Sequence, residues 1–518
     1  MFKDNKILIG KNSEKSVYIY PKMANRHGLI AGATGTGKTI TLKVLAESFS
    51  DAGVPVFLAD IKGDLAATCL TGEMNSNVAG RVENLMLDGF NVQAYPCHFW
   101  DIYQKNGLPL RTTVSEMGPL LLSRILGLND VQSDILTVLF AIADDEGLLL
   151  LDTKDLKSMI QYVGDNAKEY TLEYGNIAKQ SLGAITRAVV ALEAEGGDMF
   201  FGEPAINISD WLARDYNGKG IINILDCQKL ILNPTMYATF MLWLLSELFE
   251  TLPEAGDLDR PKMVFFFDEA HLLFDNASKD LLDKIEQTVK LIRSKGVGIY
   301  FITQSPSDIP DGVLGQLGNK IQHALRAYTP KEQKAAKAVA QSFRENPKLD
   351  TFNTLLELGV GEALISVLDE KGIPTIVERA TILPPQSQMG ALDDHIRTTK
   401  IKDNLLYTRY TQELDRESAY ELLTKKASEA RELQEQEKLQ KEQAKLQAKE
   451  DKEREKELKK QQTARKRAVK NVVSSATGTI GRELGKSVGK SIGGSFGKKI
   501  GGNVGASLIR GIFSNLIK

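Results

Sequence analysis

The stretch HGLIAGATGTGKT, residues 27–39, decides the fold. Its first part, HGLIA, has the length of a buried strand, and GATGTGKT matches the pattern GxxxxGK[ST] in full. The helix-like segment ITLKVLAESFSDAG follows directly. A glycine-rich turn between a strand and a helix lets successive backbone N–H groups point at an anion, and the helix adds the positive end of its dipole. The stretch therefore predicts a phosphate-binding loop.

The loop pattern assigns a role to each of its residues. Lys38 is expected to reach the β and γ phosphates of ATP as a catalytic cation, and the hydroxyl of Thr39 is expected to bind Mg²⁺. The residues expected to contact the nucleotide are Gly32, Ala33, Thr34, Gly35, Thr36, Gly37, Lys38, Thr39 and Ile40.

An acidic pair follows a second apolar run, MVFFF at 263–267. A magnesium nucleotide needs a carboxylate at the end of a nearby strand, so Asp268 is expected to hold the metal through water. Glu269 is expected to take a proton from the attacking water as general base. The alternative is that the pair only caps the next helix. Beside a complete phosphate loop, the catalytic interpretation is favoured.

Two more polar residues follow predicted strands. Gln304 ends VGIYFITQ, where its amide is expected to contact the γ phosphate or the attacking water; the alternative is a bond to the following turn. Arg326, in IQHALRAY, is expected to stabilise the transferred phosphoryl group, supplied from a neighbouring subunit. A structural ion pair is its alternative, and Arg293 is a second candidate for the same role.

Strand-like and helix-like patterns alternate up to about residue 385. Short apolar runs bounded by Gly, Pro or Asp predict the strands HGLIAG, VPVFLAD, GIINILD, MVFFFDEA, VGIYFITQ and IQHALRAY. This alternation is typical of an α/β fold with a mostly parallel sheet and helices on both faces. Between the second and third of these strands, at about 110–215, helical spacing of apolar residues predicts an α-helical insertion.

Bulk composition limits the function. The chain has 518 residues, 42% of them hydrophobic and 25% charged, with a formal net charge of −2. Such a balance excludes a uniformly basic nucleic-acid coat, so any DNA contact must be local. No signal-like start and no run of eighteen apolar residues occur, which predicts a cytoplasmic protein. Cys69, Cys97 and Cys227 have no CxxC spacing and are expected to be reduced, buried thiols.

Beyond a linker at 391–417, the composition changes to Glu, Lys, Gln and Ala over 418–470. This predicts a long solvated helix. Its leucines form only a thin apolar seam, which leaves a plain charged helix and a weak coiled coil as alternatives. The seam consists of Leu433, Leu439, Leu446 and Leu458.

The last segment, 471–518, carries a glycine at every fourth position. The repeat comprises Gly481, Gly485, Gly489, Gly493, Gly497, Gly501 and Gly505, with apolar residues between and several lysines. On a helix this register would let another helix or a lipid surface approach closely, so a contact with a membrane or another protein is expected. The alternative is a flexible tail, because each helical glycine costs about 1 kcal/mol.

Together, NRHGLIAGATGTGKT, the strand ending in DEAH, GVGIYFITQSPSDIP and HALRAYTPKEQKA resemble the HerA and FtsK group of DNA-pumping ATPases. The likeness is closest to the bacterial HerA-like helicase family that includes YjgR. It implies a RecA-like core over 24–390, a hexameric ring, ATP hydrolysis at subunit boundaries and movement along duplex DNA. In that family's motifs, Lys38 and Thr39 match the phosphate loop, Asp268 and Glu269 the second motif, Gln304 the sensor, and Arg326 the arginine supplied in trans.

The chain departs from that family at both ends. HerA proteins begin with a β-barrel, whereas the short strand segment 1–23 is too small for one. The charged helix and glycine-rich tail also have no counterpart in the DNA motors. The leading hypothesis is therefore a ring-forming, ATP-hydrolysing DNA translocase or helicase. The alternatives are an ATP-dependent switch or scaffold whose C-terminal segments bind a partner or membrane, and a nucleotide-binding protein with slow turnover.

Overall fold

A single mixed sheet organises the main body of the protein. The computed structural model describes residues 1–256, 258–275, 277 and 279–476. Within these residues the sheet has 13 strands in the order β1-β2-β13-β12-β11-β4-β10-β9-β5-β8-β6-β7, with β3 paired to β2. Strand bounds are β1 Phe2–Lys3, β2 Lys6–Lys11, β3 Ser16–Ile19, β4 Gly28–Ala31, β5 Val56–Asp60, β6 Cys97–Asp101, β7 Leu108–Pro109, β8 Ile222–Asp226, β9 Met263–Phe267, β10 Val297–Thr303, β11 Asn319–Gln322, β12 Glu362–Ser366 and β13 Glu378–Ile382.

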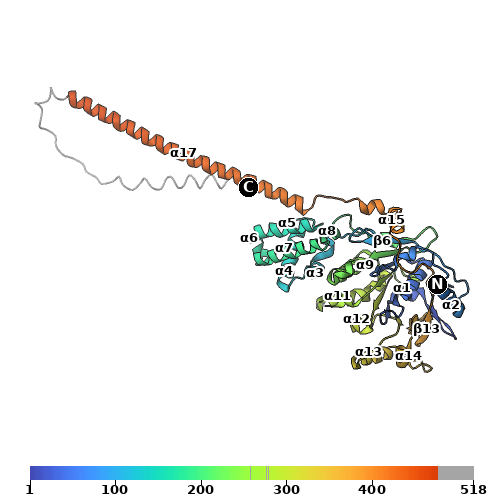
Figure 1. The fold of residues 1–518 in the computed structure, drawn as a ribbon. Helices are drawn as coiled ribbons and strands as arrows, with labels where there is room; N and C mark the ends of the chain where they lie inside the picture. The colour runs from blue at the N-terminus through green and yellow to red at the C-terminus, as the bar shows by residue number, and fades with distance from the viewer. Residues whose placement is uncertain (257, 276, 278, 477–518) are drawn as a thin grey trace. The chain divides into compact units, whose positions relative to one another are not determined.

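Helices cover both faces of the parallel part of this sheet, which runs from β11 to β7 (Figure 1). The strand β9 illustrates why. Met263, Phe265 and Phe267 join the core cluster that includes α9 and α11, whereas Val264 and Phe266 join the cluster that includes α1. Side chains alternate between the faces of a strand, so a strand that is apolar throughout needs a cover on each side.

The helices beside the sheet and in the insertion have the following bounds: α1 Lys38–Asp51, α2 Ser76–Asn84, α3 Val114–Ile125, α4 Asp130–Asp145, α5 Thr153–Asp165, α6 Ala167–Tyr174, α7 Lys179–Ala194, α8 Gly197–Phe200, α9 Pro234–Thr251, α10 His271–Phe274, α11 Lys279–Leu291, α12 Asp311–Leu314, α13 Pro330–Gln341, α14 Thr351–Glu357, α15 Asp394–Lys402 and α16 Tyr407–Thr411. From α3 to α8 they lie between β7 and β8 in the chain. The predicted fold class, a RecA-like α/β core with a helical insertion, is confirmed.

Five of the six predicted strands are present, and the sixth, IQHALRAY, overlaps β11 only at Ile321 and Gln322; the sequence prediction missed β6, β7, β12 and β13. β12 and β13 pair antiparallel, and β13 in turn pairs with β2 of the N-terminal hairpin. Their sequences EALIS and ERATI mix charged and apolar residues because this side of the sheet is partly exposed. β6, CHFWD, lacks the run of branched aliphatic residues that marks the other buried strands.

The chain divides into two compact units, 1–428 and 429–518. The long C-terminal helix of the predicted fold is α17, Ala419–Ala476. The four leucines of its seam are each more than half exposed, as in a charged helix surrounded by solvent. The predicted glycine-rich tail lies outside the described residues. Among the helices that the structure describes, none is long and apolar enough to cross a membrane.

Candidate nucleotide site

Three parallel strands bring the predicted site residues to one edge of the sheet. β10 lies between β4 and β9, with Thr303 beside Ala31 and Phe301 beside Phe267. Because parallel strands end at the same edge, the loops that follow β4, β9 and β10 emerge next to one another. These are the loops that carry the glycine-rich pattern, the acidic pair and Gln304.

Backbone hydrogen bonds fix the glycine-rich loop to its neighbours. The N–H of Gly32 donates to the carbonyl of Thr303 at 3.3 Å, and that of Ala33 donates to the carbonyl of Ala324 at 2.9 Å. Gly37 has φ +115° where it caps the start of α1, a conformation that residues with a side chain rarely adopt. The turn into α1 therefore requires a glycine at position 37.

Lys38 lies in an electrostatic environment that it shares with the acidic pair. Its Nζ donates to the carbonyl of Gly32 at 2.6 Å and to that of Ala33 at 3.2 Å. Burial lowers the pKa of Lys38, while the nearby carboxylates of Glu269 and Asp268 act in the opposite direction. The fold thus brings together two motifs that are more than two hundred residues apart in the chain.

The acidic pair has two different environments. Burial raises the pKa of Asp268 to about 6, an effect that Lys38 opposes. Asp268 is also anchored through its main chain, since the Tyr237 hydroxyl donates to its carbonyl at 2.5 Å. Glu269 has φ +46°, and its Oε2 lies 3.3 Å from Nδ1 of His271. That buried Oε2 has no hydrogen-bond partner among the described residues.

His323 contacts both the glycine-rich loop and α1, a role that the sequence did not indicate. Its Nδ1 donates to the Glu362 carbonyl at 2.8 Å, which leaves Nε2 to accept from the Thr41 hydroxyl, also at 2.8 Å. Burial lowers its pKa to about 4, so the ring is neutral. A Cβ on Gly32 would lie 2.5 Å from the Cβ of His323. His323 therefore leaves no room for a side chain at position 32.

A second contact that the sequence did not reveal comes from Gly361. Its N–H donates to the Thr36 carbonyl at 3.0 Å. Gly361 has φ +79°, and a Cβ there would lie 2.5 Å from Nη1 of Arg81. The GVG segment before β12 has no phosphate-loop pattern, so only the pairing on the antiparallel side of the sheet explains how Gly361 reaches the loop.

Gln304 and Arg326 line one cleft of about 490 Å³, together with Ala33 of the glycine-rich loop and His271. Both predicted residues are exposed. The prediction that Arg326 ends a strand is wrong, because β11 ends at Gln322. The next two residues stay beside β4 and its loop, since the His323 N–H donates to the Ala31 carbonyl and the Ala324 carbonyl accepts from the Ala33 N–H. The Arg326 guanidinium donates to the Leu356 carbonyl at 3.4 Å.

Asp60, at the end of β5, organises a turn. Its two carboxylate oxygens accept from the backbone N–H groups of Gly63, Asp64, Leu65 and Ala66, at 2.8 to 3.1 Å. Burial raises its pKa to about 6. Lys62 in this turn acts electrostatically on both Lys38 and Asp268. The turn therefore adds a cation to the same edge of the sheet.

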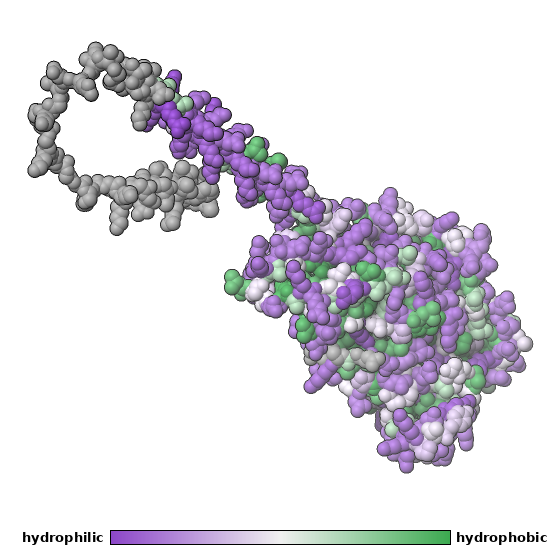
Figure 2. All heavy atoms as spheres, turned by 60° about the vertical axis from the view of Figure 1, so that its left-hand side comes forward, coloured by the Kyte–Doolittle hydropathy of each residue, from purple (hydrophilic) through white to green (hydrophobic). Residues whose placement is uncertain are grey.

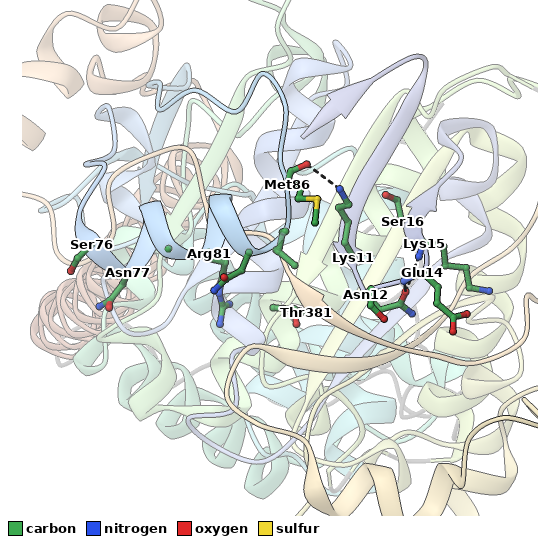
Figure 3. A pocket seen from close by; sticks show the side chains of 14 residues that line it. Lys11, Asn12, Glu14, Lys15, Ser16, Ser76, Asn77, Arg81, Met86 and Thr381 are labelled. Carbon is green, nitrogen blue, oxygen red and sulfur yellow. Dashed lines mark hydrogen bonds between the residues drawn. The ribbon is translucent and has the colours of Figure 1, made fainter.

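A larger cleft, of about 840 Å³, lies elsewhere, between the β2–β3 hairpin, α2 and β13 (Figure 3). Its cations already have protein partners. Lys11 donates to the Met86 carbonyl at 3.0 Å, and Lys15 pairs with Glu378 at 2.5 Å. None of the predicted nucleotide residues lines it. Cleft size therefore does not identify the site, whereas the convergence of motifs does.

Comparisons with known proteins agree with the resemblance. The family model described as helicase HerA-like C-terminal matches residues 5–501. The probable helicase MJECL08 of Methanocaldococcus jannaschii is 31% identical over 154 residues, which are 28% of this chain and 28% of that protein. The chain thus spans about 28% of the length of this curated relative.

Solved structures with a similar arrangement include plasmid coupling protein TrwB in complex with ADP and Mg²⁺, at 15% identity and a TM-score of 0.46 over 73% of this chain and 89% of that one. VirB4 of Thermoanaerobacter pseudethanolicus gives 15% identity and a TM-score of 0.47 over 76% and 99%. The family match extends over most of the sequence, and the P-loop and acidic motifs within it converge at one sheet edge. On this evidence the protein belongs to the helicase HerA-like C-terminal family.

Proposed function

We propose that the protein is an ATP-hydrolysing P-loop motor of the HerA and FtsK type, acting as a ring-forming DNA translocase or helicase. One observation carries the proposal: Lys38 of the glycine-rich loop lies within electrostatic range of both Asp268 and Glu269. A cation that follows a phosphate loop and faces two carboxylates is the arrangement that a magnesium triphosphate requires.

The residues present fit such a ligand. A Cβ on Gly35 would meet nothing within 4 Å, so the outer side of the loop is open. Lys38 is bonded only to carbonyls of its own loop in the contacts described, and these can be exchanged for phosphate oxygens. The buried Oε2 of Glu269 forms no hydrogen bond among the described residues, although it lies 3.3 Å from Nδ1 of His271, so it can accept from a catalytic water.

Thr39 and Asp268 would hold Mg²⁺, which when bound neutralises charge on the β and γ phosphate oxygens. The N–H groups of Gly32 and Ala33 are already bonded to Thr303 and Ala324, so the phosphates would be bound by other backbone N–H groups of residues 32–40 and by the start of α1. Lys38 would stabilise the negative charge that develops on the transferred phosphoryl group. Lys62, which is on the same edge, would add to that positive field.

Glu269 would accept the proton of the attacking water at a carboxylate oxygen. His271 lies 3.3 Å from that carboxylate and can orient it. Gln304 and Arg326 line the adjoining cleft with Ala33, which supports their roles as sensor and as stabiliser of the transferred group. The hexamer, its use of Arg326 in trans and its movement on DNA derive from the family likeness.

The experiment that tests the proposal is the rate of ATP hydrolysis with no nucleic acid, duplex DNA, single-stranded DNA or RNA, measured beside the native mass. We expect Mg²⁺-dependent turnover, stimulation by duplex DNA and an oligomer. Wild-type protein that turns over no ATP under any of these conditions would refute the motor.

An ATP-dependent switch or scaffold is the second candidate, and α17 is the observation that favours it. This helix of 58 residues is exposed from 424 to 468 and offers a long binding surface there. Turnover that no nucleic acid changes, in a protein without movement on DNA, would support the switch over the motor.

A further inference from the structure

The surface of α17 carries a regular row of cations. From Lys438 to Lys456 a lysine recurs every three or four residues, which is one per helical turn. The members are Lys438, Lys441, Lys445, Lys449, Lys452 and Lys456. The row continues at Lys459 and Lys466 and is about 40 Å long at 1.5 Å per residue. All of these residues are exposed. We call this row the lysine stripe.

No comparable row of apolar residues accompanies the stripe in the described helix. By helical spacing, Leu439 and Leu446 lie on one side of it and Leu433 and Leu458 on another. Glutamines such as Gln443 and Gln447 occupy the face opposite the lysines. Figure 2 accordingly shows the described part of the helix as hydrophilic, with isolated hydrophobic residues. The helix therefore lacks the apolar face by which amphipathic helices insert into a bilayer.

Each lysine of the stripe from Lys438 to Lys459 has a glutamate three or four residues away in the sequence. Lys441 and Lys459 pair with glutamates four residues earlier, at 3.2 and 2.9 Å. However, Lys441, Lys445 and Lys449 follow one another at intervals of four, and so do Lys452 and Lys456. Like charges at this spacing cost a helix about 0.2 to 0.5 kcal/mol per pair.

The charge balance also changes along the helix. Glutamates lie on both sides of the stripe as far as Glu457, but the described residues beyond it, up to Ala476, include no acidic residue. That acid-free part holds Lys459, Lys460, Arg465, Lys466, Arg467 and Lys470. Positive potential therefore increases toward the end of α17.

We propose that the lysine stripe of α17 binds the phosphate backbone of nucleic acid. A row of ammonium groups about 5.4 Å apart complements a polymer that carries one negative charge per 1.7 Å of duplex axis. Lysine is a flexible point charge that follows a backbone without reading its bases, so the binding is independent of sequence. The inference concerns only unit 429–518 and does not depend on ATP hydrolysis.

The test measures binding of the full-length protein to fluorescent duplex DNA, single-stranded DNA and RNA, without nucleotide, from 50 to 200 mM salt. In the variant Lys445→Gln, Lys449→Gln, Lys452→Gln, Lys456→Gln, four phosphate contacts are removed. The slope of log K against log salt should become shallower by about 3 to 4. Affinity at 50 mM salt should fall about tenfold or more. Unchanged slope and affinity would overturn the proposal.

A matched variant separates the stripe from net charge. Exchanging two lysines with neighbouring glutamines, as Gln443→Lys, Lys445→Gln, Gln447→Lys, Lys449→Gln, moves two cations to the opposite face. Composition and net charge are unchanged, and Lys and Gln have similar helix propensities. We expect about half of the slope change seen with four neutralised lysines. If this variant bound nucleic acid like wild type, total charge would be sufficient, and the proposal that the lysine stripe forms the binding surface would be overturned.

Two further readouts remove the alternatives. Vesicles rich in phosphatidylserine offer anionic lipid headgroups in place of a nucleic-acid backbone. If they bind the protein as tightly as duplex DNA does, and lose it in the same variants, the surface is a membrane contact and the proposal fails. Basal ATP hydrolysis should be the same in wild type and both variants. The test of nucleic-acid binding by the stripe is therefore independent of the test of the ATPase motor.

Discussion

The edge of the sheet around Lys38 and the surface of α17 differ in how far their charged groups are buried. At the sheet edge, a few ionisable groups are partly buried and perturb one another, so that the pKa of Asp268 rises to about 6. Along α17 many charged groups are exposed and separated by solvent, which screens them. The comparison teaches that a substitution at the sheet edge should have a large effect from a single residue. On α17 only several substitutions together should have one.

The largest effect is expected from Lys38→Ala. It removes the cation that donates to the loop carbonyls and interacts electrostatically with the acidic pair, so we expect ATP hydrolysis to fall by more than about 1,000-fold. A steady-state ATPase assay measures this. Lys445→Ala on α17 is the matched control and should leave the rate unchanged. If the two variants lowered the ATPase rate equally, the proposed difference between the sheet edge and α17 would be wrong.

Arg326→Ala should lower turnover by about 1,000-fold if the guanidinium stabilises the transferred phosphoryl group. Mixing this variant with Lys38→Ala shows which subunit supplies the arginine. Recovery of activity on mixing the two inactive proteins means supply in trans, because mixed boundaries then contain one intact Lys38 and one intact Arg326. No recovery in mixed oligomers would mean that Arg326 serves the site of its own chain.

Glu269→Gln keeps the size of the side chain but removes the base. We expect ATP binding to persist, while turnover falls about 100-fold. Binding of a fluorescent ATP analogue and the hydrolysis rate are measured on the same sample. Normal turnover would remove Glu269 as the base and leave it as a partner of His271.

His323→Ala should raise the KM for ATP about tenfold with a smaller change in kcat, because His323 positions the loop without touching the phosphates. The variant leaves the Glu362 carbonyl and the Thr41 hydroxyl without their described partner, at about 1 to 3 kcal/mol. His323→Asn can restore the donor to Glu362 and should recover part of the KM. No recovery, with a normal melting temperature, would argue against positioning.

The smallest effect is a pH dependence of stability at His27. Its ring accepts from the Ile299 N–H and donates to the Val289 carbonyl, and burial lowers its pKa to about 4. Since the unfolded pKa is about 6.5, the unfolded chain takes up the proton first. The stabilising contribution is therefore lost as pH falls from about 6.5 to about 4, by about 2 kcal/mol between pH 7 and 5.

Denaturant titrations of wild type and His27→Asn at several pH values measure this contribution. The difference in unfolding free energy between the two proteins should shrink as pH falls. Using the difference matters, because Asp60 and Asp268 have raised pKa values and contribute with the opposite sign. A difference that is independent of pH would mean that the ring is protonated alike in both states.

Much of the nucleotide site could be predicted from local sequence. The glycine-rich loop and the acidic pair each occupy consecutive residues whose spacing alone states the chemistry. Arg326 shows where this approach fails: its strand was predicted to continue to the arginine, but β11 ends at Gln322. His323 and Gly361 could not be predicted as parts of the site, since their contacts with the loop depend on how β11 and β12 pair.

The sequence by itself determined the loop, the acidic pair, the alternation of strands and helices, and the lysine stripe, because each depends on spacing along one short segment. Only the tertiary structure decided that β10 separates β4 from β9, and that Lys38 and Asp268 perturb each other. It also decided that His323, the residue after β11, contacts the glycine-rich loop. The reason is physical: strand order and burial are properties of the whole sheet, which no single segment encodes.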